Sequence, residues 1–284
     1  MTGSTLEWHP GSSDALLLLG HATGFCKEIW RPVVAELRKQ GIDAAALAWD
    51  ARGHGSSVPL DSPVTWWTFG RDLLDLIDEL SPTAPVVGVG HSMGGAATVM
   101  AELIRPGLLA GMVLIEPVII PRYLRSSREH PLATMAAKRR PTFPSREAAA
   151  SSYRSKPLFS RWHEDAFSGY LEGGLVPHAD GVVLACLPEA ESAVFAASTE
   201  TGLFERLDEL TPPIRLLISD YPGELEAVMN ALEGRLPNAE TSFLLGQSHM
   251  VVMERPDLVA AEIADFIRDP GVGVISCASS GSSL

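Results

Sequence analysis

The sequence predicts an α/β protein with a mostly parallel central sheet flanked by helices. Short apolar runs alternate with longer amphipathic stretches in the first and last thirds of the chain. Glycine-rich turns follow several of these runs, and the alternation stops in a proline-containing middle segment. Such alternation is typical of βαβ units, so we expect one α/β core that is interrupted by an insertion.

The first part of the core is expected to hold four strands and three helices. Each strand is a short apolar run, and each helix carries apolar residues at helical spacing, as Leu73, Leu76 and Ile77 illustrate. Gly41 supplies a stop for the first helix. The expected order is strand 15–19, helix 30–40, strand 44–49, helix 64–80, strand 86–89, helix 94–105 and strand 112–115.

A mostly helical lid without a convincing buried strand is expected over residues 121–211. The α/β pattern then resumes, so the core comprises residues 1–120 and 212–270. The Ser-rich residues 271–284 are expected to form a flexible tail. The remaining core elements are expected in the order strand 214–218, helix 224–232, strand 241–245 and helix 257–268.

Composition narrows the classes of partner. The 284 residues carry a formal net charge of −13, which disfavours nucleic acid and anionic membranes as partners. The longest apolar runs are too short to span a bilayer, and the N-terminus lacks the layout of a signal peptide. Cys26, Cys186 and Cys277 show no metal-ligand spacing and are expected to be free thiols. We therefore expect a cytoplasmic monomer or homodimer that acts on a small molecule.

The strongest motif for chemistry is Gly90-His91-Ser92-Met93-Gly94, which follows a buried strand and begins a helix. It fits G-x-S-x-G, in which a serine occupies a strained, sharp strand-to-helix turn. Glycines two residues before and after the serine are needed because side chains there would obstruct the turn. The N-terminus of the following helix favours developing negative charge.

The same stretch has an alternative interpretation as a dinucleotide-binding turn. Gly88-Val89-Gly90 follows a strand and opens a helix, and Glu116 ends the next strand, where a ribose-binding acid would fall. Met93, however, occupies the third glycine position. Two predicted strands also precede this one, whereas the first strand of such a sheet usually carries the turn.

Three further motifs accompany this turn. Gly20-His21-Ala22-Thr23-Gly24-Phe25 follows the first strand, Asp50-Ala51-Arg52-Gly53-His54-Gly55 follows the second, and Gly246-Gln247-Ser248-His249 follows the last. Together the four motifs resemble the α/β-hydrolase superfamily outside the insertion and tail. The resemblance is greatest to lidded serine esterases and their epoxide-hydrolase and dehalogenase relatives.

The resemblance implies a nucleophile and a base. Ser92 takes the nucleophile role, and His249, in the loop after the last strand, is the base that removes its proton. The superfamily's oxyanion hole implies the backbone N–H groups of Met93 and Thr23, with Ala22 in place of a usual glycine. The other histidines are expected to be turn or surface residues: His21, His54, His91 and His163.

The acid of the triad stays open. The superfamily usually places it a few residues after the strand that ends near Ile218, but Tyr221-Pro222-Gly223 stands there. Asp220 and Glu224 flank that position. Dehalogenase-like relatives place the acid one strand earlier, which here is Glu116. We favour Glu116, with Glu224 and Asp220 as alternatives and a structural role at the lid entry as the competing interpretation.

A serine nucleophile suits acyl transfer on an ester, thioester or lactone and disfavours epoxide or halide chemistry. No metal or organic cofactor is expected. The same triad could instead support C–C bond hydrolysis, perhydrolysis or elimination. A third hypothesis, motivated by the missing acid, is a small-molecule receptor on a degenerate hydrolase fold.

The lid has a basic first half and an acidic second half. These charges either pair with each other or attract an anionic substrate. The aromatic residues of the lid are expected mainly to pack it onto the core. The larger apolar side chains are Phe159, Trp162, Phe167, Tyr170, Leu171, Phe195 and Phe204, and the basic residues are Arg122, Arg125, Arg128, Lys138, Arg139, Arg140, Arg146, Arg154, Lys156 and Arg161.

Overall fold

A seven-stranded sheet forms the core of the computed structural model, which describes residues 6–125, 130–219 and 224–269. Its spatial order is β1-β3-β2-β4-β5-β9-β10, and every neighbouring pair is parallel except β1 with β3. The mostly parallel sheet is therefore confirmed, with β4 at its centre. The strands are β1 Leu6–His9, β2 Ser12–Gly20, β3 Ala44–Trp49, β4 Val86–His91, β5 Gly111–Ile115, β9 Ile214–Ser219 and β10 Ala239–Leu244.

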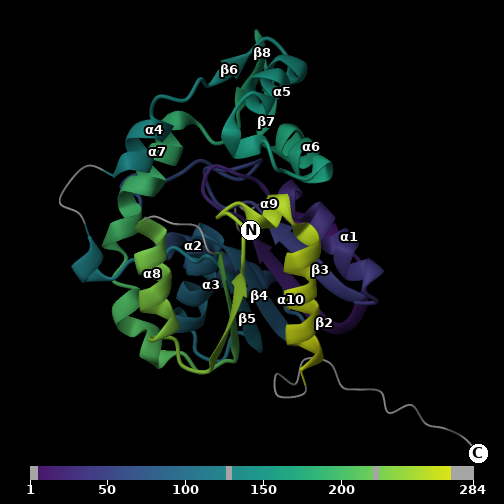
Figure 1. The fold of residues 1–284 in the computed structure, drawn as a ribbon, viewed down its shortest axis with the longest axis vertical. Helices are drawn as coiled ribbons and strands as arrows, with labels where there is room; N and C mark the ends of the chain where they lie inside the picture. Colours follow the sequence, from purple (N-terminus) through teal and green to yellow (C-terminus); the bar gives the residue numbers. More distant parts are fainter. Residues whose placement is uncertain (1–5, 126–129, 220–223, 270–284) are drawn as a thin grey trace, which may run out of the picture.

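Helices cover both faces of this sheet (Figure 1). Val33 of α1 and Ile263 of α10 belong to one buried cluster, whereas Leu73 of α2, Val99 of α3 and Leu232 of α8 belong to a second. Burial on both faces explains why the inner strands read as continuous apolar runs. The helices are α1 Arg31–Lys39, α2 Trp67–Leu80, α3 Met93–Ile104, α8 Glu224–Glu233, α9 Val251–Glu254 and α10 Pro256–Arg268, with a short 3-10 helix η1 at Lys27–Trp30.

The insertion between β5 and β9 forms a lid at one end of the sheet (Figure 1). Its described residues contain four α-helices and four 3-10 helices, but also a three-stranded antiparallel sheet in the order β6-β8-β7. The elements are η2 Arg122–Leu124, α4 Pro131–Ala136, β6 Thr142–Phe143, α5 Arg146–Arg154, η3 Pro157–Phe159, α6 Glu164–Gly173, β7 Leu175–His178, β8 Gly181–Leu184, α7 Pro188–Ala197, η4 Ser198–Glu200 and η5 Phe204–Glu209.

The expectation that the lid lacks a convincing buried strand is therefore wrong. Its strands have two to four residues each, which is too short for alternation to separate them from loops. β8 buries Val182 and Leu184 and leaves Val183 half-buried between them. β1 is likewise an unpredicted strand of four residues. The expected tail, residues 271–284, lies outside the described residues.

Two tryptophans before and at the start of α2 hold the lid to the core. The Trp66 indole N–H donates to the Val194 carbonyl at 2.8 Å, and the Trp67 indole N–H donates to the Thr201 carbonyl at 2.8 Å. α2 begins at Trp67 rather than at residue 64. Both indole rings thus join the core to the lid backbone by hydrogen bonds.

An aromatic cluster fills the space between the lid and the loop after β2. The Phe25 ring lies 5.3 Å from that of Trp162 and 5.5 Å from that of Tyr170, between ring centres. Phe159 and Phe167 are also buried in this cluster. Most of the lid aromatics therefore pack, as expected, and one of their contacts is the loop that carries Thr23.

Many lid charges are paired. Five of the ten basic residues between Arg122 and Arg161 form ion pairs with glutamates, which supports charge pairing over a general attraction for anions. Arg146 instead donates to the backbone carbonyls of Leu171 and Leu175. The ion pairs are Arg122 with Glu205, Arg125 with Glu200, Arg139 with Glu191, Arg154 with Glu164 and Arg161 with Glu254. Arg128 lies outside the described residues.

Candidate active site

Ser92 stands between β4 and α3 in a strained backbone conformation. Its φ of 56° and ψ of −113° are unfavourable for a residue with a side chain. The Ser92 N–H donates to the Ile115 carbonyl at 2.9 Å, and its carbonyl accepts from the Ala96 N–H at 3.1 Å. The turn is therefore held from both sides, with the serine at the N-terminus of a helix.

Close backbone packing explains the glycines around Ser92. A Cβ at Gly90 would lie 2.4 Å from the Gly95 nitrogen, and a Cβ at Gly94 would lie 2.3 Å from the Gly20 oxygen. Both distances are too short for real atoms. The spacing G-x-S-x-G is thus required by the contacts that this turn makes with α3 and β2.

Glu116 and His249 are hydrogen-bonded to each other. Glu116 follows β5, is 2% exposed, and places Oε2 3.1 Å from Nδ1 of His249. Its other oxygen, Oε1, accepts from the Ser219 N–H at 2.5 Å and from the Ser219 hydroxyl at 2.7 Å. Because both oxygens are engaged, the carboxylate is fixed and can orient the imidazole with Nε2 free to act as a base.

Ser92 and Glu116 both have a strained backbone conformation. In the described part of the chain, four non-glycine residues have a positive φ, and Ser92 and Glu116 are two of them. Glu116 has a φ of 48°. Asp220 and the side chain of Glu224 lie outside the described part of the chain.

His91 connects the serine turn to the loop of His249. Its Nε2 lies 2.8 Å from the His249 carbonyl oxygen, and the two imidazole rings are 5.0 Å apart. His91 is fully buried, and burial together with nearby His249 holds its pKa well below the usual range. A neutral His91 with a proton on Nε2 can donate to that carbonyl, which ties the loop of His249 to the residue that precedes Ser92.

The loop after β2 reaches the start of α3, where the expected oxyanion donors lie. The Gly94 N–H donates to the His21 carbonyl at 3.1 Å. Met93 is the first residue of α3, and Thr23 follows two residues after His21. No hydrogen bond among the described residues uses the N–H of Met93 or of Thr23. Both groups are therefore free to donate to a developing oxyanion.

Buried histidines support this loop. His21 is 1% exposed, accepts from the Ala51 N–H at Nε2 (3.0 Å), and places Nδ1 2.8 Å from the Ala22 carbonyl. Burial lowers the pKa of His21, and burial together with His21 lowers that of His54 to about 3. His21, His54 and His91 lie in or next to turns, as expected, and all three are buried, whereas His163 in the lid is exposed.

An ionic cluster anchors the other end of the same loop. Asp50 is fully buried and accepts from the backbone N–H and the Nζ of Lys27, both at 2.8 Å. The Ser56 N–H also donates to Asp50, at 3.1 Å. Lys27 pairs in addition with Glu28 at 2.9 Å. The sequence pattern does not predict this cluster, because Lys27 and Asp50 are 23 residues apart.

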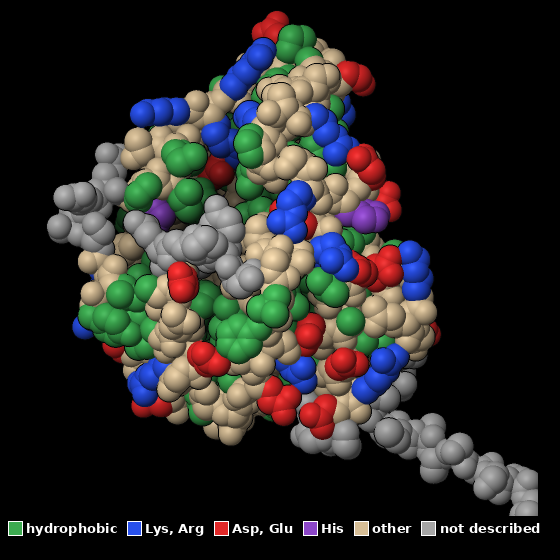
Figure 2. Space-filling view, in the orientation of Figure 1, with side chains coloured by type: hydrophobic (Ala, Val, Ile, Leu, Met, Phe, Trp, Pro, Cys, Tyr) green, Lys and Arg blue, Asp and Glu red, His purple; other side chains and the backbone are tan. Residues whose placement is uncertain are grey.

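The face of the molecule between two parts of the lid is hollowed (Figure 2). Figure 2 shows hydrophobic side chains on the α4–α7 side of this hollow. Leu132 and Met135 of α4 and Leu187 before α7 are among the exposed large hydrophobic residues, at 47%, 66% and 46%. These side chains give the α4–α7 part of the lid an exposed apolar surface.

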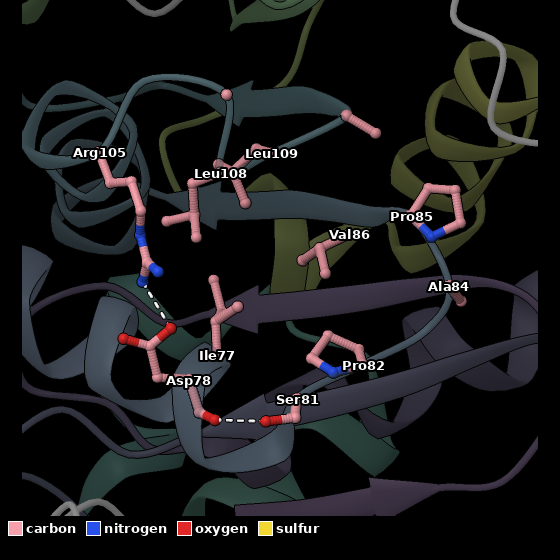
Figure 3. A pocket seen from close by; sticks show the side chains of 12 residues that line it. Ile77, Asp78, Ser81, Pro82, Ala84, Pro85, Val86, Arg105, Leu108 and Leu109 are labelled. Atoms are coloured by element: carbon pink, nitrogen blue, oxygen red, sulfur yellow. Dashed lines mark hydrogen bonds and ion pairs between the residues drawn. The ribbon is translucent and has the colours of Figure 1, made fainter.

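A second depression, of about 380 Å³, lies at the opposite end of β4 from Ser92 (Figure 3). Val86, the first residue of β4, lines it together with Leu109. Its one ion pair, Arg105 with Asp78 at 2.7 Å, joins two exposed side chains. It holds none of the expected catalytic residues.

This fold and the turn at its central strand define an α/β-hydrolase. A profile of the Alpha/beta hydrolase family matches residues 16–262, and the chain belongs to that family. The dinucleotide-binding alternative is thereby wrong, in agreement with the contact between Glu116 and His249.

Several known proteins are similar in sequence. Human monoglyceride lipase is 36% identical over 118 residues, which cover 40% of this chain and 38% of the lipase. A type I acyl-CoA thioesterase, mpaH', of Penicillium brevicompactum is 29% identical over 160 residues, covering 51% of this chain and 37% of the thioesterase. The chain thus matches less than two-fifths of the length of these relatives.

Solved structures are similar over nearly the whole chain. The peroxisomal α/β-hydrolase Lpx1 of Saccharomyces cerevisiae has a TM-score of 0.78 at 20% identity, covering 96% of this chain and 81% of Lpx1. A thermophilic esterase of Thermogutta terrifontis has a TM-score of 0.70 at 20% identity, and the match covers 96% of this chain and 94% of the esterase. At this identity the likeness shows the fold alone.

Proposed function

We propose that the protein is a serine hydrolase that cleaves small to medium esters, thioesters or lactones through an acyl-enzyme on Ser92. The observation that carries the proposal is the hydrogen bond between Glu116 and His249, next to a strained serine at a helix N-terminus. The similar lipase and thioesterase act on ester and thioester bonds, which agrees with acyl transfer.

In acylation, Nε2 of His249 takes the proton from the Ser92 hydroxyl while Oγ attacks the substrate carbonyl carbon. The N–H groups of Met93 and Thr23 stabilise the resulting oxyanion. The intermediate collapses when the leaving alcohol or thiol receives the proton from His249. Water then attacks the acyl-enzyme with His249 again as base, which releases the acid and restores Ser92.

Glu116 acts in this scheme through His249. Its carboxylate holds the Nδ1–H tautomer and stabilises the imidazolium that forms in each step. The receptor hypothesis was motivated by the lack of an acid, and the bond from Glu116 to His249 removes that motivation. The exposed apolar side chains of Leu132, Met135 and Leu187 on the lid favour a mainly apolar acyl or alcohol group.

Among the described residues, no helix has the length and hydrophobicity needed to cross a membrane. The cytoplasmic location and the monomeric or homodimeric state stay predictions.

A turnover assay tests the proposed function. We expect native protein to hydrolyse p-nitrophenyl butyrate, a short-chain thioester and a small lactone at different rates, all of which vanish in Ser92→Ala. Native-like folding of Ser92→Ala, shown by circular dichroism, is the control. Turnover that persists in Ser92→Ala, or no turnover of any acyl substrate by native protein, contradicts the proposal.

A further inference from the structure

The loop that carries Thr23 touches a carboxylate of the lid. Gly24 has a φ of +83°, and a Cβ there would lie 2.5 Å from Oε1 of Glu191. The contact joins the loop after β2 to helix α7, which are far apart in sequence. Glu191 therefore lies against the backbone next to one of the two expected oxyanion donors.

Glu191 is buried, and its charge is compensated by one arginine. Its residue is 7% exposed, and Oε2 pairs with Nη1 of Arg139. Arg139 is held in place because its Nη2 donates to the Tyr170 hydroxyl at 2.8 Å. Oε1 of Glu191 accepts no hydrogen bond from the described residues. Compensation of this carboxylate therefore depends on Arg139.

The other ion pairs within the lid are different. The glutamates that pair with Arg122, Arg125 and Arg154 have side chains 35% to 78% exposed, compared with 9% for Glu191. Water screens the charges of those exposed glutamates, so their paired arginines contribute little to compensating them. A buried carboxylate in a low-dielectric surrounding acts over a longer distance.

An uncompensated carboxylate at this place would oppose catalysis. Acyl transfer develops negative charge at the oxyanion, which the Thr23 N–H is proposed to stabilise. A second negative charge beside Gly24 would raise the energy of that intermediate. We propose that Arg139 is a positioning residue of the lid, which neutralises Glu191 so that the oxyanion loop can receive negative charge. This inference rests on the proposed function.

A double-mutant cycle tests this role. Arg139→Met, Glu191→Gln and the double variant are assayed at pH 8 with p-nitrophenyl butyrate. We expect Arg139→Met to lower kcat about 10- to 100-fold with a smaller change in KM. Removing the carboxylate as well should restore kcat in the double variant to within about threefold of native, since no charge is then left to oppose the oxyanion.

Arg139→Lys keeps the charge and should retain most of kcat. Arg122→Met and Glu205→Gln, at an exposed lid pair, are the matched controls and should leave kcat unchanged. Near-ultraviolet circular dichroism of the aromatic lid cluster checks that each variant is folded. Should Arg139→Met fail to fold, Arg139→Gln replaces it in the cycle, because glutamine removes the charge but keeps an N–H donor for the Tyr170 hydroxyl.

The inference is overturned if the double variant is as slow as Arg139→Met, or if Arg139→Met has native kcat. Inactivity of native protein toward acyl substrates would instead contradict the proposed function. The two failures are therefore distinguishable in one experiment.

Discussion

The carboxylate of Glu116, at the end of β5, lies 3.1 Å from Nδ1 of His249 and is fixed on its other oxygen by Ser219, at the end of β9. β5 and β9 are neighbours in the sheet, with Ile115 opposite Leu217. A residue at either strand end can therefore approach the same histidine. In this chain a carboxylate from one strand end contacts His249, and a hydroxyl from the other strand end donates to that carboxylate.

Glu116→Gln should lower kcat by about 10²–10⁴-fold with little change in KM, because the amide can no longer stabilise the imidazolium. Steady-state hydrolysis of p-nitrophenyl butyrate measures the change. Glu102→Gln is a matched control, since Glu102 is equally buried and accepts from the Gly107 and Leu109 N–H groups. It should lower stability but not kcat. Equal kcat values for the two variants would argue against Glu116 as the acid.

His91→Phe should lower kcat about tenfold, because it removes one hydrogen bond to the His249 carbonyl while keeping a ring of similar size. His178→Phe, at an exposed lid histidine, is the control. The acylation rate of each variant is measured by stopped-flow kinetics. An acylation rate in His91→Phe that matches the control would mean that this bond does not position His249.

Gly24→Ala should destabilise the fold by about 1–3 kcal/mol, because the residue has a positive φ and its Cβ would meet Glu191. Gly41→Ala separates the two effects, since Gly41 has a φ of +77° but no described atom within 4 Å of the added Cβ. Its cost should be about 1 kcal/mol. Urea unfolding measures both, and equal costs would show that the Glu191 contact is unimportant.

Stability should fall as the pH is lowered from about 6.5 toward 3. Burial lowers the pKa of His54 to about 3, so below pH 6.5 the unfolded chain binds a proton that the folded chain does not. The lowered pKa values of His21 and His91 act in the same direction. Unfolding free energies across this range should be less pH-dependent in His54→Gln. An unchanged slope would contradict the buried, neutral state of His54.

Much of the core could be predicted from the sequence because its strands are buried on both faces. The apolar run of β3 was placed at its observed bounds, and those of β4 and β9 were placed to within two residues. The lid strands and β1 were missed because two to four residues carry no usable periodicity.

Parts of the site depend on tertiary contacts that sequence spacing does not reveal. The sequence does not decide which strand end carries the acid, because the carboxyl ends of neighbouring parallel strands, such as β5 and β9, lie at the same edge of the sheet. The contact of His91 with His249 joins residues 158 positions apart, and the Arg139–Glu191 pair spans 52. Gly24 belongs to the motif that follows the first strand, but its contact with Glu191 depends on the folding of the lid and cannot be predicted from spacing.

Labelling by a fluorophosphonate probe, followed by peptide mapping, tests most directly whether Ser92 is an activated nucleophile. Such a probe reacts with an activated serine and does not require the natural substrate. We predict labelling at Ser92 in native protein, none in Ser92→Ala, and much slower labelling in His249→Ala and Glu116→Gln. Labelling at another residue, or equal rates in native protein and His249→Ala, would contradict the proposed catalytic unit.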